Sequence, residues 1–574
     1  MDATTTLAPT AVTALHDVLY RPETAHLHER WRDLVGTAEF AYPEGRSHQE
    51  RVLRSYRLLR IVNDSLDDVP AFAADAEQLT MMHEWTAGVD GGLTAVAGIH
   101  YNLFLGSLLD LESSRRRDLS DFTALRRTGT FLCTERAHGN DAARMETTAT
   151  RDQHGFVLHT PHAGAAKFMP NTGPAGGPKS GLVAAKLIMD GEDYGIHLFL
   201  TPLRDAAGPR PGVRVELLPE TFTGAVDHCA TAFDRVRLPP EALIGPLPER
   251  RTVGSGRQRF LRAIGRVTTG KLCMSACGVG AAKLAVARAV HFAHRRRTSG
   301  LAPGSSVTLF EHRAHQTRLL DALATTYAII ALHRRAVRAW TGATASTRAE
   351  AERLVAVVKG WTTWHGRAVV IECRERCGSR GVFRLNGFGD PMANLEGPVT
   401  AEGDNLVVWS KAAGELVLGR RAYTDRTAVV DMDDPDHLQD LLAAVEEGWH
   451  RRAGRRLRDR AARTPLERWN NAVNPALELV DAHARRLAGE ALLDMAESAR
   501  SPEAQAMLRL VHRLFALRQV TAHAGTLLAA GRLAAPVVED LPDRCDAAVL
   551  ELAPHALPLV AAFGVDGTLE RPLT

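Results

Sequence analysis

The stretch GLVAAKLIMDGEDYGIHLFLTPL, residues 181–203, decides how the chain is organised. It contains two apolar runs around Asp190-Gly191, a dipeptide typical of tight β-hairpin turns. Further strand signals lie on both sides: ETTATRDQHGFVLHTP (146–161) alternates across a turn, and TAFDRVRLP (231–239) ends at a proline. We therefore predict a β region from about residue 128 to residue 245.

Apolar residues recur at helical spacing before and after this β region. Helices are predicted within residues 1–124, in three long stretches (259–297, 309–341 and 347–377), and again from Leu438 onwards. The first long stretch is rich in Ala, Gly and Ser, which suits close helix packing. Because the strands are grouped and do not alternate with helices, the predicted class is α+β, mostly α, with segregated layers.

The chain of 574 residues is too long for one hydrophobic core. We expect an N-terminal helical domain (1–124), a β domain (125–246), a helical bundle domain (247–432) and a C-terminal helical domain (433–574). A short linker rich in Gly and Arg, residues 253–257, follows the β domain.

The composition excludes several classes of protein. The net charge of +3, from 70 basic and 67 acidic residues, indicates no nucleic-acid partner. No apolar run approaches the length of a membrane span, so no span is expected. Seven cysteines, an odd number, favour reduced thiols and a cytoplasmic location, and the C-terminal RPLT is not a peroxisomal address.

The hexapeptide TAEGDN, residues 400–405, places one carboxylate, Glu402, in a loop after a helical stretch. That carboxylate is either a solvated loop charge or a base that the loop holds against a substrate. A glutamate becomes a useful base when burial raises its pKa towards neutrality. The chain has no GxSxG nucleophile elbow. The residues alone leave both interpretations open.

Three other patterns each have a plain structural interpretation. The pairs His291/His294 and His312/His315 have helical spacing, but no carboxylate or cysteine completes a metal set, so no metal site is predicted. The run Arg295–Arg297 is either a solvated helix end or a phosphate contact. The glycines of CGSRGVFRLNGFGD (377–390) could approach a phosphate, but they follow no strand and the stretch contains no lysine, so it is interpreted as a loop.

Taken in order, four blocks resemble the acyl-CoA oxidases and, more distantly, the acyl-CoA dehydrogenase superfamily. They run from about residue 128 to residue 415: FLCTERAHGNDAARMETTAT; KFMPNTG followed by DGEDYGIHLFL; RRRTSG followed by LATTYA; and ECRERCGSRG with TAEGDN. The resemblance implies FAD as cofactor and a homodimer. It also implies a fold with N-terminal helices, a β-barrel-like middle domain, a C-terminal four-helix bundle and an additional C-terminal helical domain.

The resemblance also assigns residues to roles. Glu402 matches the general base, and Ala401 and Gly403 lie in the substrate pocket. The positions that match cofactor contacts are Thr134, Gly139, Phe168, Asn171, Arg296, Gly378, Gly381, Asp404 and Asn405.

The implied reaction is α,β-dehydrogenation of an acyl-CoA or acyl-carrier-protein thioester to the 2-enoyl thioester. Glu402 takes the α-proton, hydride passes to flavin N5, and O2 reoxidises the flavin with release of H2O2. The alternatives are a dehydrogenase that uses an electron-transfer protein, a flavin oxygenase of the same superfamily, and a non-catalytic homologue that binds a partner.

The sequence departs from the family pattern near the expected site. Ala401 stands where the family has tyrosine, Phe168 and Met169 replace two tryptophans, and Asn171 replaces a glycine. The changes at Ala401, Phe168 and Met169 suggest an altered acyl pocket, suited to an unusual or carrier-protein-bound substrate, as in a divergent bacterial enzyme of specialised metabolism. The change at Asn171 leaves the electron acceptor open.

Overall fold

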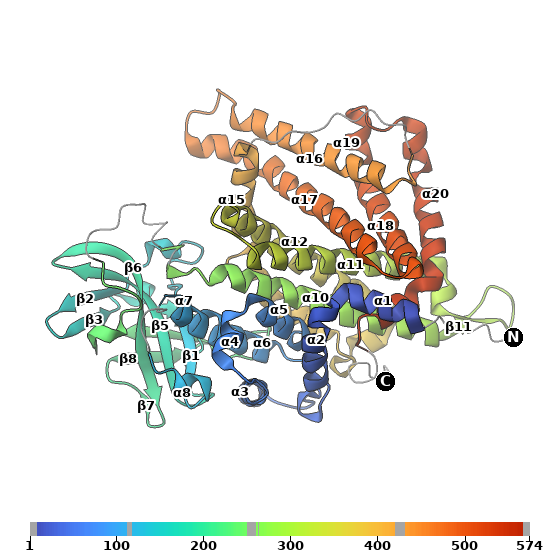
Figure 1. Cartoon of the computed structure of the whole chain (residues 1–574). Helices are drawn as coiled ribbons and strands as arrows, with labels where there is room; N and C mark the ends of the chain where they lie inside the picture. Colours follow the sequence, from blue (N-terminus) through green and yellow to red (C-terminus); the bar gives the residue numbers. More distant parts are fainter. Residues whose placement is uncertain (1–8, 112–116, 249–259, 262, 420–430, 566–574) are drawn as a thin grey trace. The chain divides into compact units, whose positions relative to one another are not determined.

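The computed structural model describes residues 9–111, 117–248, 260–261, 263–419 and 431–565 (Figure 1). Its contacts divide the chain into two compact units. We call Ala38–Cys273 the β unit, and Met1–Thr37 together with Met274–Thr574 the helical unit. The predicted linker 253–257 lies outside the described residues. The division into four domains stays a prediction.

The N-terminal part of the β unit is helical, as predicted. Its helices begin at polar caps: Ser47 and Glu50 form a capping box at the start of α3, and Asp68, Asp75 and Asp90 accept backbone N–H groups at the starts of α4, α5 and α6. The helices are α3 (His48–Asp64), α4 (Val69–Ala74), α5 (Ala76–Thr86), α6 (Gly91–Ala97), a π-helix (Gly98–Gly106), α7 (Ser107–Leu111) and α8 (Ser120–Thr123).

Two sheets form the rest of the β unit. The larger has the strand order β10-β3-β2-β5-β6-β7, with β1 pairing parallel to β5, and the smaller has the order β4-β9-β8. The strands are β1 (Thr128–Leu132), β2 (Thr148–Asp152), β3 (Gly155–His159), β4 (Lys167–Phe168), β5 (Lys179–Met189), β6 (Glu192–Asp205), β7 (Gly208–Pro209), β8 (Val213–Leu217), β9 (Cys229–Phe233) and β10 (Val236–Leu238).

Residues 181–203 form the predicted hairpin. Met189 pairs with Glu192 across the turn, and Asp190 and Gly191 both have positive φ, 50° and 79°. Two left-handed residues match the twist of the flanking strands, which explains why Asp-Gly is favoured here. Figure 1 shows β5 and β6 as long strands of a curled sheet.

Successive side chains of a strand point to opposite faces of its sheet, and those that point inwards form one core between the two sheets. Side chains of β5 and β6 share a buried cluster with residues of β3, β8 and β9. Its members include Phe156, Leu158, Val183, Ala185, Leu187, Phe199, Leu203, Val213 and Phe233.

A buried polar network joins α3 to both sheets. Lys179 Nζ donates to Asp227 Oδ2 at 2.8 Å, to the Tyr56 hydroxyl at 2.8 Å and to the Asn171 carbonyl oxygen at 2.6 Å. The Tyr56 hydroxyl donates to Asp227 Oδ1 at 2.6 Å. A buried ammonium needs such partners, because an unpaired charge in the interior is costly.

The helical unit contains the long helices that were predicted. Figure 1 shows α16, α17 and α18 in orange to red. Its elements are α1 (Pro9–Tyr20), α2 (Pro22–Val35), most of α10 (Val267–Arg295), β11 (Arg297–Ser299), β12 (Ser306–Thr308), α11 (Arg313–Thr341), α12 (Arg348–Arg376), α13 (Gly389–Asn394), α14 (Glu396–Thr400), α15 (Asn405–Leu418), α16 (Pro435–Leu457), α17 (Pro465–Ser498), α18 (Pro502–Ala522), α19 (Ala524–Ala529), α20 (Ala535–Leu552) and α21 (Ala556–Ala561).

Helices α10 and α12 approach closely at two glycines. A methyl group on Gly278 would lie 2.8 Å from the Thr362 carbonyl oxygen, and one on Gly366 would lie 2.9 Å from the Gly278 carbonyl oxygen. Either alanine would force the two backbones apart. The small residues of α10 therefore serve the close packing that the sequence indicated.

Two helical stretches, Gly91–Leu111 and Val267–Arg295, are long and apolar enough to span a membrane by length and composition. The prediction that no apolar run approaches this length is therefore wrong. Within their most apolar windows, 72% and 94% of the residues are buried inside the structure, as in the core helices of globular domains. All seven cysteines are free thiols, and only Cys133 among them is partly exposed.

Asp227 supplies the only carboxylate described in the buried network around Lys179, so we expect a large loss of stability when Asp227 is made neutral. In Asp227→Asn the ammonium loses its ionic partner, and we expect the free energy of unfolding to fall by about 3–5 kcal/mol. Urea unfolding measures this change. Asp152→Asn is the control, because Asp152 pairs with Arg237 in a solvated ion pair. Equal losses in the two variants would contradict the role given to the network.

Candidate functional site

The predicted base lies in a tight turn between α14 and α15. Glu402 is half-buried and has a φ of 59°, and Gly403 after it has a φ of 97°. A residue with a side chain pays roughly 1–3 kcal/mol for a left-handed backbone, so the surrounding structure must impose it. Six other described residues with side chains also have a positive φ, so this backbone makes Glu402 a candidate functional residue, and its contacts must decide between the two interpretations of TAEGDN.

Helix α12 holds the segment that follows Glu402. Trp409 Nε1 donates to the Val357 carbonyl oxygen at 3.1 Å, and a methyl group on Gly360 would lie only 2.1 Å from that indole nitrogen. Asn405 Nδ2 donates to Thr363 Oγ1 at 2.9 Å. The absence of a side chain at residue 360 lets the indole lie against the helix, which fixes the first turn of α15.

The two polar residues after Glu402 therefore have structural roles. Asp404 caps α15 by accepting the Leu406 N–H at 3.0 Å, and Asn405 is fully buried against α12. Their predicted contacts with a cofactor stay predictions. Ala401 and Gly403, assigned to the substrate pocket, are both exposed.

Sequence reasoning missed one residue at this loop, Lys359 of α12. Its side chain is fully buried, and Nζ donates to the carbonyl oxygens of Val399 at 2.9 Å and Gly403 at 2.7 Å, on the two sides of Glu402. The available signal was a single lysine within the otherwise uncharged run LVAVVKGWTT, residues 354–363. Helical periodicity alone could not show which group this ammonium contacts.

In the β unit, a buried ion pair arranges the predicted flavin contacts. Glu135 and Lys167 have no exposed side-chain surface and lie 3.0 Å apart. The Glu135 carboxylate also accepts the backbone N–H groups of Glu146 at 2.6 Å and Thr147 at 2.9 Å. Burial alone would raise the pKa of Glu135, but Lys167 and these hydrogen bonds together hold it below its usual value of 4.5.

Because side chains alternate, the neighbours of this pair point outwards. Thr134 is exposed, and its carbonyl oxygen accepts the Phe168 N–H at 2.9 Å. Phe168 is 36% exposed, Met169 beside it is 41% exposed, and the Arg136 guanidinium lies 6.0 Å from the Phe168 ring centre. The Thr134 hydroxyl group and the Phe168 ring are thus exposed on a part of the β unit that the buried ion pair keeps rigid.

The other two predicted contacts of the β unit differ in exposure. Gly139 is exposed, and a side chain there would meet nothing within 4 Å. Asn171 is fully buried: its side chain accepts a hydrogen bond from Thr130 and donates one to the Tyr56 hydroxyl at 3.0 Å. The side chain of Asn171 is thus used inside the protein, and its contact with a flavin ring stays a prediction.

The predicted phosphate contacts lie in the helical unit. Arg296 is exposed at the junction of α10 and β11, and its guanidinium makes no hydrogen bond or ion pair with the residues that the structure describes. Gly378 follows α12 with a φ of 58° and open space in front of it. A methyl group on Gly381 would lie 2.2 Å from the Arg374 carbonyl oxygen, so this glycine serves packing.

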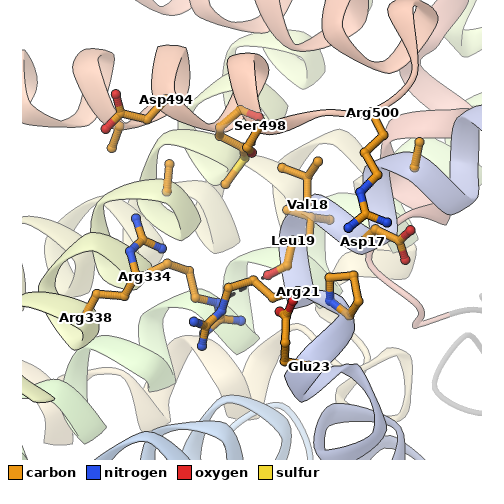
Figure 2. Close-up of a pocket in the computed structure, with 15 residues that line it drawn as sticks. Asp17, Val18, Leu19, Arg21, Glu23, Arg334, Arg338, Asp494, Ser498 and Arg500 are labelled. Atoms are coloured by element: carbon orange, nitrogen blue, oxygen red, sulfur yellow. Dashed lines mark hydrogen bonds between the residues drawn. The ribbon is translucent and has the colours of Figure 1, made fainter. Parts of the chain in front are cut away.

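A hollow of about 320 Å³ in the helical unit lies among α1, α2, α11 and α17 (Figure 2). None of the predicted site residues lines it. Arg21, Arg334, Arg338 and Arg500 line it together with Asp17, Glu23 and Asp494. Because these charges nearly balance, the hollow favours no one class of charged ligand.

Within the described ranges, no group of three His, Cys, Asp or Glu side chains is arranged to hold a metal ion. Of the two histidine pairs, His294 stacks on Phe310 with the ring centres 4.0 Å apart, and its Nδ1 lies 2.8 Å from the Val290 carbonyl oxygen. These contacts give His294 a packing role.

Comparison with known proteins identifies the family. Residues 265–417 match the model of the acyl-CoA oxidase C-alpha1 domain, and residues 434–569 match the model described as acyl-CoA oxidase. The chain belongs to the acyl-CoA oxidase family. The predicted family is confirmed.

Relatives of the acyl-CoA oxidase family resemble this chain over most of its length. The peroxisomal acyl-coenzyme A oxidase 2 of Arabidopsis thaliana is 26% identical in an alignment of 511 residues that covers 79% of this chain and 73% of the relative. An acyl-coenzyme A oxidase-like protein of Mus musculus is 28% identical in an alignment of 399 residues that covers 66% of this chain and 61% of the relative.

Solved acyl-CoA oxidases share the fold. Acyl-CoA oxidase 1 from Yarrowia lipolytica aligns with a TM-score of 0.86 at 21% identity, covering 98% of this chain and 89% of the other. Acyl-CoA oxidase-1 of Caenorhabditis elegans aligns with a TM-score of 0.83 at 19% identity, covering 96% and 89%. The predicted fold, mostly helical with a curled β domain, is confirmed.

The low pKa of Glu135 predicts a pH-dependent stability for this member of the acyl-CoA oxidase family. Glu135→Gln carries the neutral state at every pH. Because the native pKa lies below 4.5, the carboxylate stabilises the folded chain above pH 4.5, and this contribution is lost as the pH falls through the native pKa.

We expect the wild type to exceed Glu135→Gln in free energy of unfolding by a constant amount above about pH 6, and by a shrinking amount below pH 4.5. Urea unfolding at a series of pH values measures the difference. A difference that stays constant down to about pH 3 would contradict the charged state assigned to Glu135.

Proposed function

We propose that this chain is an FAD-dependent acyl-thioester oxidase that introduces a double bond between Cα and Cβ, with Glu402 as general base. The observation that carries the proposal is the left-handed backbone of Glu402 in a turn whose flanking carbonyl groups are held by a buried lysine. A carboxylate fixed at such an energetic cost is better explained by chemistry than by solvation.

The surfaces described above fit an FAD molecule. An exposed ring beside a hydroxyl group suits a planar heterocycle with polar edges, and an exposed arginine with an open glycine suits a pyrophosphate. Thr134 and Phe168 would hold the ring of one FAD, and Arg296 and Gly378 would reach the phosphates of the FAD bound by the partner subunit of a homodimer. Two relatives from Caenorhabditis elegans were solved with FAD, one with FAD and ATP and the other with FAD, ascaroside-CoA and ATP.

The reaction balances as a two-electron oxidation. The Glu402 carboxylate accepts the α-proton of the acyl thioester, and a hydrogen leaves Cβ with its electron pair, so that a 2-enoyl thioester remains. When bound, FAD would supply the acceptor for that electron pair, and O2 would take the two electrons together with the Cβ hydrogen and the proton released from Glu402, giving H2O2. The relatives named as oxidases support O2 as the final acceptor.

The residues around Glu402 support a roomy acyl pocket. Ala401 and Gly403 are small and exposed on both sides of the base. A bulky side chain at residue 401 would fill the space that they leave. We therefore propose an acyl thioester with a branch or ring near the reacting carbons, carried by CoA or by an acyl-carrier protein.

Replacing the base tests the assignment. In Glu402→Gln the carboxamide cannot accept the α-proton, so the rate at which substrate bleaches the flavin without oxygen should fall by about 10²- to 10⁴-fold. Bound FAD should be unchanged. Glu415→Gln is the control, because Glu415 lies on α15 next to Lys411 and outside the turn. Normal bleaching in Glu402→Gln would rule out this base.

The electron acceptor and the substrate are tested together. We expect a screen of acyl-CoA and acyl-carrier-protein thioesters, first without oxygen and then with air, to find flavin bleaching that air reverses. One equivalent of H2O2 should form for each enoyl product. Bleaching that only an electron-transfer protein reverses would indicate a dehydrogenase, and an oxygenated product an oxygenase. A purified protein that binds no FAD would exclude all three.

A further inference from the structure

The buried ammonium of Lys359 contacts the two ends of the Glu402 turn. The Val399 carbonyl oxygen lies three residues before Glu402, in α14, and the Gly403 carbonyl oxygen follows Glu402 directly. Both hydrogen bonds have a charged donor that is itself fully buried, and bonds from a charged donor are stronger than neutral ones. One side chain therefore joins the two ends of the strained turn.

A charged group is an unexpected choice at this position. The neighbouring residues Val355, Val358 and Trp361 of α12 are fully buried apolar side chains. An apolar residue at position 359 would avoid the cost of burying an ammonium. Replacing buried charged side chains by well-packed apolar ones often stabilises a protein. The position of this costly group against the turn of the base points to a role in function.

We propose that Lys359 is a positioning residue: by holding the carbonyl oxygens on both sides of Glu402, it fixes where the base presents its carboxylate. This inference rests on the proposed function of Glu402. Without the ammonium, the turn can relax from its left-handed backbone and the carboxylate moves with it. A displacement of about 1 Å at a catalytic group costs on the order of 100-fold in rate.

Lys359→Met tests the proposal, because methionine keeps most of the length of the side chain and removes its charge and donors. In the full-length protein loaded with FAD, we expect anaerobic flavin bleaching at saturating substrate to slow by about 100-fold. The FAD content and the substrate concentration at half-maximal rate should change by less than about threefold, because the variant alters the position of the base and leaves the binding surfaces intact.

Lys283→Met is the matched control. Lys283 belongs to the same unit and is 2% exposed, and its Nζ donates to the Tyr20 hydroxyl at 2.8 Å. We expect it to lose stability without slowing the bleaching. Equal slowing in Lys359→Met and Lys283→Met would show that Lys359 has only a structural role and would overturn the inference. Normal bleaching in Lys359→Met, with Glu402→Gln inactive, would overturn the inference and leave the proposed function intact. A wild type that no acyl thioester bleaches would overturn both.

Lys359→Arg keeps the inference testable if the methionine variant does not fold. The guanidinium restores a charged donor, but its rigid planar fork cannot reproduce the geometry of an ammonium between two carbonyl groups. We expect bleaching to slow by about tenfold relative to the wild type, while Lys283→Arg keeps the wild-type rate. A normal rate in Lys359→Arg would contradict the claim that the geometry of this ammonium fixes the position of Glu402.

Discussion

The conformation of the Glu402 turn depends on the contacts that α12 makes with the segment from Val399 to Trp409. One helix supplies a buried ammonium to the turn, a hydroxyl group to Asn405 and a bare glycine backbone to the Trp409 indole. Each contact reaches a different part of the segment, so no single residue of the loop can move alone. Glu402 keeps its left-handed backbone conformation because these contacts fix the residues around it.

The β unit uses the same physical device. Lys167 is buried against Glu135, and the carboxylate collects two backbone N–H groups, so the chain on both sides of the pair is held in one conformation. The alternation of side chains then turns Thr134 and Phe168 outwards. In both units, hydrogen bonds to rigid partners offset the desolvation cost of a buried lysine. These hydrogen bonds also fix the positions of the exposed neighbouring residues.

Local patterns were sufficient for much of the fold. Asp190-Gly191 predicted the hairpin because only a few residue pairs adopt two left-handed conformations cheaply, and apolar spacing located α10, α11 and α12 within a few residues at most ends. The same spacing could not tell a buried core helix from an apolar run long enough to span a membrane. That distinction depends on what packs against the helix.

The candidate site could be predicted less completely. The resemblance placed Glu402 in its loop, but the strain at Glu402 and the contacts of Lys359 arise from residues distant in sequence, which no local pattern reports. Asn171 was matched to a flavin contact by position, whereas its side chain is committed to Tyr56 and Thr130. Matching positions identifies candidates, and burial with hydrogen bonding then decides which side chains are available.

In the proposed reaction, a carboxylate held in this turn removes a proton from Cα while a hydrogen leaves Cβ. The most direct measurement is the rate of anaerobic flavin bleaching with substrates that carry deuterium at Cα or at Cβ. We expect deuterium at either carbon to slow the reaction, because both bonds break in the oxidation. Bleaching at an unchanged rate with both labelled substrates, under conditions where chemistry limits the rate, would contradict it.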